Sequence, residues 1–169
     1  NHADAEVYMD SVHYKLNVGC ADCHMPIVED KTGTRYRSHD SSKSVLNSKA
    51  SMQYCLGCHT SDKVKTVKDM VAYVRNAQKS VAEKDAAVAK KQDETFDLLK
   101  VAIEGKKLDE KAINEAKFKY AVAAYYKEFV YGNRGATPGE KVAHNPEKNR
   151  RYLEKALSVL DEAQTILKN

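Results

Sequence analysis

All four cysteines of the chain lie in two copies of one pattern, Cys-x-x-Cys-His, which are "CADCH" (20–24) and "CLGCH" (55–59). Two thiols three positions apart can each add across a vinyl group of haem, and the next histidine can then bind the iron. The spacing therefore predicts two covalently attached c-type haems. The residues concerned are Cys20, Cys23 and His24 in the first copy and Cys55, Cys58 and His59 in the second.

Other chemistry is compatible with four cysteines. Four thiolates could hold a structural zinc ion, although the two histidines would then have no role. A redox dithiol or disulfides are further alternatives. Because both copies end in histidine and consume every cysteine, we favour haem. Covalent haem attachment implies maturation outside the cytoplasm, so we expect a periplasmic or otherwise extracytoplasmic protein.

The remaining histidines are candidates for the second axial position of each iron. They are His2, His13, His39 and His144. Four methionines compete with them, namely Met9, Met25, Met52 and Met70. Ligation by two histidines gives a lower potential than ligation by histidine and methionine, so the surplus of histidine favours low-potential electron transfer. The residues alone do not assign a histidine to each iron.

Composition bounds the class of protein. The chain has 169 residues, is 42% hydrophobic and 31% charged, and lacks the run of about 20 apolar residues that a membrane span needs. Its net charge of +4 is spread without dense Lys/Arg clusters, so we expect no nucleic-acid partner. The chain opens at Asn1 in a polar segment without a signal peptide, and we expect a processed or fragmentary product.

The pattern along the chain predicts a mainly α fold. Residues 1–62 form an irregular, dihaem-binding segment with short helices at 3–16 and around each motif, and no strand alternation is visible. Residues 63–169 form a long-helix region, and the two parts are expected to make one structural unit. Long helices are expected over about 63–104, over 109–131 with Asp109 as N-cap, and from Pro146 onward, with a loop over 132–139.

The first long helix carries a narrow apolar seam that repeats every seven residues. Its members are Val67, Val74, Val81 and Val88, continued by Thr95 and Ala102. Such a seam can pack within the chain or form part of a homodimer interface. The third long helix carries a broader apolar face. That face comprises Leu153, Ala156, Leu157, Leu160, Ala163 and Leu167.

Longer runs of the sequence are similar to a known family. They are "NHADAEVYMDSVHYKLNVGCADCHMPIVEDKTGTRYRSHD", "CLGCHT" and "AHNPEKNRRYLEKAL". These runs resemble the C-terminal part of the pentahaem, ammonia-forming cytochrome c nitrite reductases. The resemblance covers nearly the whole chain and is weakest over residues 66–131, where only helicity matches.

The resemblance implies a role for each remaining histidine. His144 would be the distal ligand of the haem on the first motif, and His13 that of the haem on the second. His39 would bind a haem whose attachment motif is not in this chain, and His2 would be the catalytic, substrate-side histidine. The family's calcium site is commonly formed in part by Gln before that histidine. Asn1 stands there instead, so calcium is expected only with a further upstream region.

The resemblance also implies a function that this chain does not complete alone. The family's catalytic haem sits on a Cys-x-x-Cys-Lys motif that the chain lacks, so the chain alone should not reduce nitrite. It would transfer electrons through two bis-histidine haems as part of a nitrite reductase. Its partners would be an upstream haem-bearing part or another multihaem subunit, a redox donor protein, and a second copy through the long helices. The alternative is a self-standing dihaem carrier or wire subunit without substrate chemistry.

Overall fold

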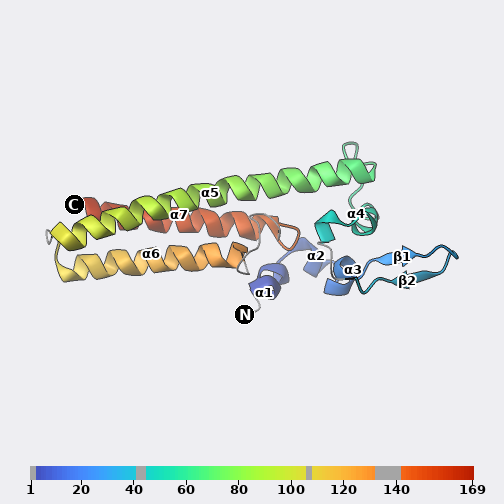
Figure 1. The fold of residues 1–169 in the computed structure, drawn as a ribbon, viewed down its shortest axis with the longest axis horizontal. Coiled ribbons are helices and arrows are strands. Elements are labelled where there is room, and N and C mark those ends of the chain that lie inside the picture. Colours follow the sequence, from blue (N-terminus) through green and yellow to red (C-terminus); the bar gives the residue numbers. More distant parts are fainter. Residues whose placement is uncertain (1–2, 41–44, 106–107, 132–141) are drawn as a thin grey trace.

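The computed structural model describes residues 3–40, 45–105, 108–131 and 142–169, and the predicted mainly α fold is confirmed. Three long helices lie side by side, and all the shorter elements gather at one end of them (Figure 1). None of the helices in these ranges is long and apolar enough to cross a bilayer. The loop predicted over 132–139 lies outside the described residues.

The long helices are α5 (Val67–Gly105), α6 (Glu110–Tyr131) and α7 (Pro146–Lys168). They begin and end within a few residues of the predicted positions. Helix α7 packs against both α5 and α6. Ion pairs join Lys84 to Glu154 and Lys91 to Asp161, so α5 and α7 run in the same direction and α6 runs back between their ends.

The core of the bundle uses the predicted seam. Val81 and Val88 of α5 are buried against Ala123 of α6 and against Leu153 and Leu160 of α7. The seven-residue repeat keeps one side of α5 turned toward its neighbours, because 3.6 residues make a turn and seven make nearly two. This part of the seam therefore packs within the chain.

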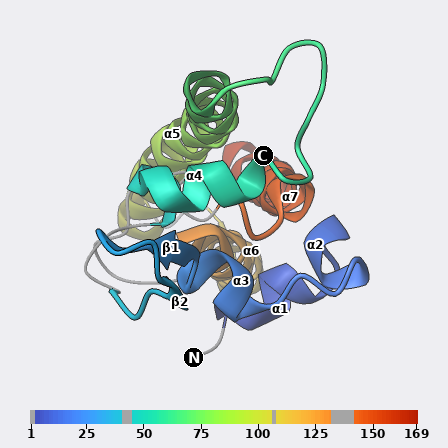
Figure 2. The ribbon, with the colours of Figure 1, turned by 90° about the vertical axis from the view of Figure 1, so that its right-hand side faces the viewer.

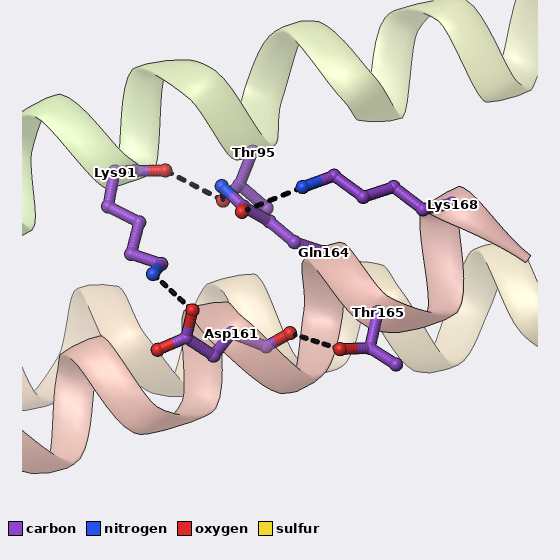
Figure 3. A network of polar contacts seen from close by, with 6 residues as sticks. All are labelled: Lys91, Thr95, Asp161, Gln164, Thr165 and Lys168. Atoms are coloured by element: carbon purple, nitrogen blue, oxygen red, sulfur yellow. Dashed lines mark hydrogen bonds and ion pairs between the residues drawn. The ribbon is translucent and has the colours of Figure 1, made fainter.

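Between α5 and α7, a small group of polar side chains lies where the seam has Thr95 in place of an apolar residue (Figure 3). Gln164 of α7 donates through Nε2 to Oγ1 of Thr95 at 3.1 Å, and Thr95 Oγ1 donates to the carbonyl oxygen of Lys91 at 2.7 Å. Both side chains are buried. Since a buried polar group left without a partner costs about 1–3 kcal/mol, this pairing opposes a slip of α7 along α5.

Side-chain caps set the starts of the long helices. Asp109 accepts from the amide of Ala112 at 2.7 Å, as its predicted N-cap role requires. Asn145 accepts from the amide of Lys148 at 3.0 Å, and Pro146 follows at the first helical position, where its missing N–H costs nothing. At α5, the carboxylate of Asp69 accepts from Thr66.

The N-terminal segment forms short helices over 3–16, as predicted. They are α1 (Ala3–Met9) and α2 (Val12–Lys15). Ser11 ends the continuity because its Oγ accepts from the amide of Tyr14 at 3.0 Å and so caps a new helix. The first motif is itself a short helix, α3 (Cys20–His24). The second follows η1 (Val45–Asn47) and lies at the end of α4 (Lys49–Cys55).

A hairpin interrupts the helical pattern, and the expectation of no strands was wrong here. Strands β1 (Ile27–Glu29) and β2 (Arg35–Arg37) pair antiparallel. Asp30 shapes the turn by accepting from the amides of Thr32 and Thr34, and Gly33 takes a φ of 85°, which glycine adopts without strain. Strands of three residues are too short to show alternation in the sequence.

Two contacts bring the short elements to the bundle end that Figure 2 faces. A small apolar cluster joins α4 to the start of α5, and its buried members are Met52, Val64, Met70 and Val74. On the other side, Asn145 donates through Nδ2 to the carbonyl oxygen of Val7 at 3.1 Å, which ties α1 to the start of α7. Both motif-bearing segments therefore rest on the same end of the three helices.

A matched pair of substitutions tests this packing. Val88 is 0% exposed and Val101, also on α5, is 67% exposed. We expect Val88→Ala to lower the free energy of unfolding by about 2 kcal/mol, since two buried methyl groups are removed and a cavity remains. Val101→Ala should change it by less than about 0.5 kcal/mol. Chemical denaturation followed by circular dichroism measures both, and equal effects would contradict the core assignment.

Candidate functional site

The first Cys-x-x-Cys-His motif is held at both ends of α3. The carboxylate of Asp22 accepts from the amide of Gly19 at 2.7 Å, just before the helix. The amide of Met25 donates to the carbonyl oxygen of Ala21 at 2.9 Å and closes its end. Cys20 is exposed and Cys23 is partly buried. One thiol thus faces solvent and the other faces the protein.

The second motif repeats this division of exposure. Cys55 ends α4 and packs against the small apolar cluster, whereas Cys58 is exposed. All four cysteines are free thiols. Burial raises the pKa of the Cys23 and Cys55 thiols, and the nearby Cys55 raises that of Cys23 further. The inner thiols of the two motifs thus lie near one another.

His59 of the second motif faces His13 of α2. Their Nε2 atoms are 3.4 Å apart. Nδ1 of His13 lies 3.2 Å from the carbonyl oxygen of Ala143, which can only accept, so Nδ1 carries the proton and Nε2 presents a lone pair. Burial lowers the pKa of His59, and His13 lowers it further. His59 therefore favours its neutral imidazole, the form that binds metal.

His24 of the first motif faces His144, which lies two residues before α7. Their ring centroids are 6.2 Å apart and the rings are tilted by 45°. The ring of Tyr8 lies beside His144, with 6.3 Å between centroids. The Tyr8 hydroxyl is buried without a hydrogen-bond partner, and burial, followed by the charges of Cys20 and Cys23, raises its pKa. A buried hydroxyl without a partner is unusual and fits a site that receives a polar group of another molecule.

Both histidine pairs fit an ion bound between two imidazoles. Metal–imidazole bonds are about 2.0–2.1 Å long, so two nitrogens on opposite sides of one ion lie about 4 Å apart, and the ring centroids about 6 Å apart. The centroids of His13 and His59 are 5.7 Å apart, close to this requirement. By contrast, the described residues, which include all four cysteines, contain no group of three or more Cys, His, Asp or Glu arranged to hold a metal. The four-thiolate zinc alternative therefore has no geometric support.

One short segment before α7 supports both pairs. The carbonyl oxygen of Ala143 holds His13, while the next side chain, His144, faces His24. The role of Ala143 could not be found in the sequence, because a backbone carbonyl leaves no residue signal. Tyr8 was missed for the same kind of reason, since a lone tyrosine is usually packing. The cap at Asn145 did have a signal, because Asn directly before Pro marks a helix start.

The other two predicted histidines lie apart from these pairs. His39 is exposed, follows β2 and belongs to neither pair. His2 lies outside the described residues, so its predicted catalytic role stays a prediction.

The sequence as a whole matches a known family over its full length. Residues 1–169 are covered by the family model of cytochrome c552. The chain belongs to the cytochrome c552 family. This is the family of cytochrome c nitrite reductase, so the resemblance noted from the motifs is confirmed. Membership supports covalently bound haem c and haem-based electron transfer or nitrite reduction in general.

Proposed function

We propose that this chain holds two covalently attached haems, each bound between two histidines, and relays electrons within a nitrite-reducing cytochrome. The observation that carries the proposal is the pairing of each motif histidine with a histidine distant in sequence. His24 meets His144, and His59 meets His13. Haem, when bound, supplies reversible one-electron chemistry at its iron. The chain would supply the four thiols, two histidine nitrogens for each iron, and the fixed distance between the two sites.

The axial histidines also support a low potential. Two imidazoles stabilise the ferric state more than histidine with methionine does. His13 donates its Nδ1 proton to Ala143, which orients the ring and makes Nε2 a stronger donor to a metal. We therefore propose bis-histidine ligation at both sites.

Nitrite reduction requires more than these residues. The chain has no Cys-x-x-Cys-Lys motif, and we propose that the catalytic haem is borne by an upstream part or by another multihaem subunit. The exposed His39 would bind a haem of that partner, His2 would face the substrate, and calcium would bind only there. We place the protein outside the cytoplasm, with electrons entering from a redox donor protein.

We also propose a homodimer through the long helices. Phe118 and Tyr125 lie on one side of α6, seven residues apart, and are 70% and 61% exposed. Phe96 of α5 is exposed as well, and its ring contacts Tyr120 of α6. Large aromatic side chains are enriched in protein interfaces, and this apolar side of α5 and α6 is the surface that we assign to a second copy.

Counting haems tests the central proposal. Pyridine haemochrome and peptide mass mapping should give two covalent haems within residues 1–169, one on each motif, beside any haems borne by an upstream part. The Cys55→Ala/Cys58→Ala double variant should retain one, because the first motif is intact. A colourless native protein would end the proposal. If the intact preparation holds two haems but shows no nitrite-dependent oxidation of a reduced dye, the self-standing carrier replaces the nitrite-reducing role.

Changing an axial histidine tests the ligand assignment. We expect His13→Met to raise one of the two midpoint potentials and to leave the other nearly unchanged, since methionine opposite histidine favours the ferrous state. His39→Gln is the matched control, and both potentials should stay in place. A spectroelectrochemical titration measures them. Two unchanged potentials in His13→Met would contradict the role of His13.

The dimer proposal is tested at Phe118. Phe118→Asp places a charge in the proposed interface, and we expect the sedimentation coefficient to fall from that of a dimer to that of a monomer. Lys117→Asp, at an exposed neighbouring position on α6, should leave the dimer intact. If the native protein sediments as a monomer at micromolar concentration, the proposed interface is wrong.

A further inference from the structure

Arg37 of β2 reaches back to the backbone of the first motif. Its Nη1 donates to the carbonyl oxygens of Ala21 and Met25, both at 3.2 Å. Ala21 follows the first cysteine of the motif, and Met25 follows its histidine. The carbonyl oxygen of Ala21 already accepts from the amide of Met25, so this guanidinium adds a second donor there. It also supplies a donor to the carbonyl oxygen of Met25, the residue that caps the end of α3.

The same guanidinium also pairs with a side chain inside the motif. Nη2 of Arg37 lies 3.2 Å from Oδ1 of Asp22, while the other oxygen of Asp22 accepts from the amide of Gly19 at 2.7 Å. Arg37 and Asp22 together therefore hold α3 at both its start and its end.

The segment that Arg37 contacts also packs against the segment that carries the second motif. Helix α3 contacts α4, at whose end Cys55 lies. The contacts of Arg37 and Asp22 that hold α3 therefore also hold the side that α3 presents to α4.

We propose that Arg37 is a positioning residue for the first haem-attachment segment and that, with Asp22, it sets the placement of this segment relative to the second. The inference rests on the proposed function, in which both segments carry haem. A helix of five residues is not stable by itself, so α3 needs contacts from outside to keep its shape. A planar guanidinium has a fixed set of donors, which lysine cannot reproduce.

Arg35 provides a matched control for charge. It lies two residues before Arg37 on the same strand and is exposed. The structure shows no hydrogen bond or ion pair for its side chain within the described ranges. Arg35→Gln and Arg37→Gln remove the same charge from the same hairpin, and only the second removes contacts with α3.

The experiment uses the haem-loaded protein and a redox titration followed by electron paramagnetic resonance. A His144→Met variant first identifies the signal of the haem on the first motif. We expect Arg37→Gln to shift that signal and to lower that haem's midpoint potential, because the carboxylate of Asp22 is left without its cation. Arg35→Gln should match the native protein. Arg37→Lys should bring the midpoint potential of that haem most of the way back to the native value, because lysine keeps the positive charge. It should restore the native resonance signal less completely, because lysine lacks the fixed, planar set of donors of arginine.

The outcomes distinguish a failure of the positioning role of Arg37 from a failure of the proposed function. A native protein with fewer than two haems overturns the proposed function itself. If every variant holds two haems and Arg37→Gln has the same potential and signal as Arg35→Gln, the positioning role of Arg37 is wrong and the proposed function stands. If Arg37→Gln loads haem only on the second motif while Arg35→Gln loads both, the positioning role is supported.

Discussion

Two imidazole rings that face one another are the constraint on which the rest of the structure depends. Nε2 of His13 and Nε2 of His59 lie 3.4 Å apart, and Nδ1 of His13 lies 3.2 Å from the carbonyl oxygen of Ala143, which can only accept. With its proton on Nδ1, His13 turns a lone pair toward His59. The lowered pKa of His59 favours its neutral form, which can meet that lone pair with an N–H or can share a metal ion with it. Either arrangement requires the two rings to keep this separation.

The long helices hold the histidine pairs in place, because the short elements that carry these histidines pack against them. Helix α5 carries the apolar cluster under α4 and also Tyr73, whose ring lies 6.0 Å from that of His59. Helix α7 starts directly after the segment that holds His13 and His144. A slip between α5 and α7 would therefore move one histidine of each pair relative to the other. The valine core and the Thr95–Gln164 hydrogen bond oppose such a slip, so packing far from the site preserves its geometry.

The parts of this arrangement that repeat in the sequence could be predicted from it. The spacing of Val81 and Val88 gave the inward side of α5, and Asp109 marked the start of α6, because both depend on neighbours along one helix. The Cys-x-x-Cys-His spacing singled out His24 and His59, the motif histidine of each pair. The facing histidines followed only from a family resemblance, since His13 and His59 are brought together by the fold. The hairpin, the break at Ser11 and the contacts of Arg37 left no periodic signal.

The two sites share more than a common end of the bundle. Ala143, which orients His13, and His144, which faces His24, are consecutive, so a shift of this backbone reaches both pairs. The next residue, Asn145, is buried, caps α7 and donates to the carbonyl oxygen of Val7. Its side chain thus joins the helix that follows His144 to the helix that precedes His13. These hydrogen bonds tie α1 to the start of α7, so the distance between the two histidine pairs depends on this one junction.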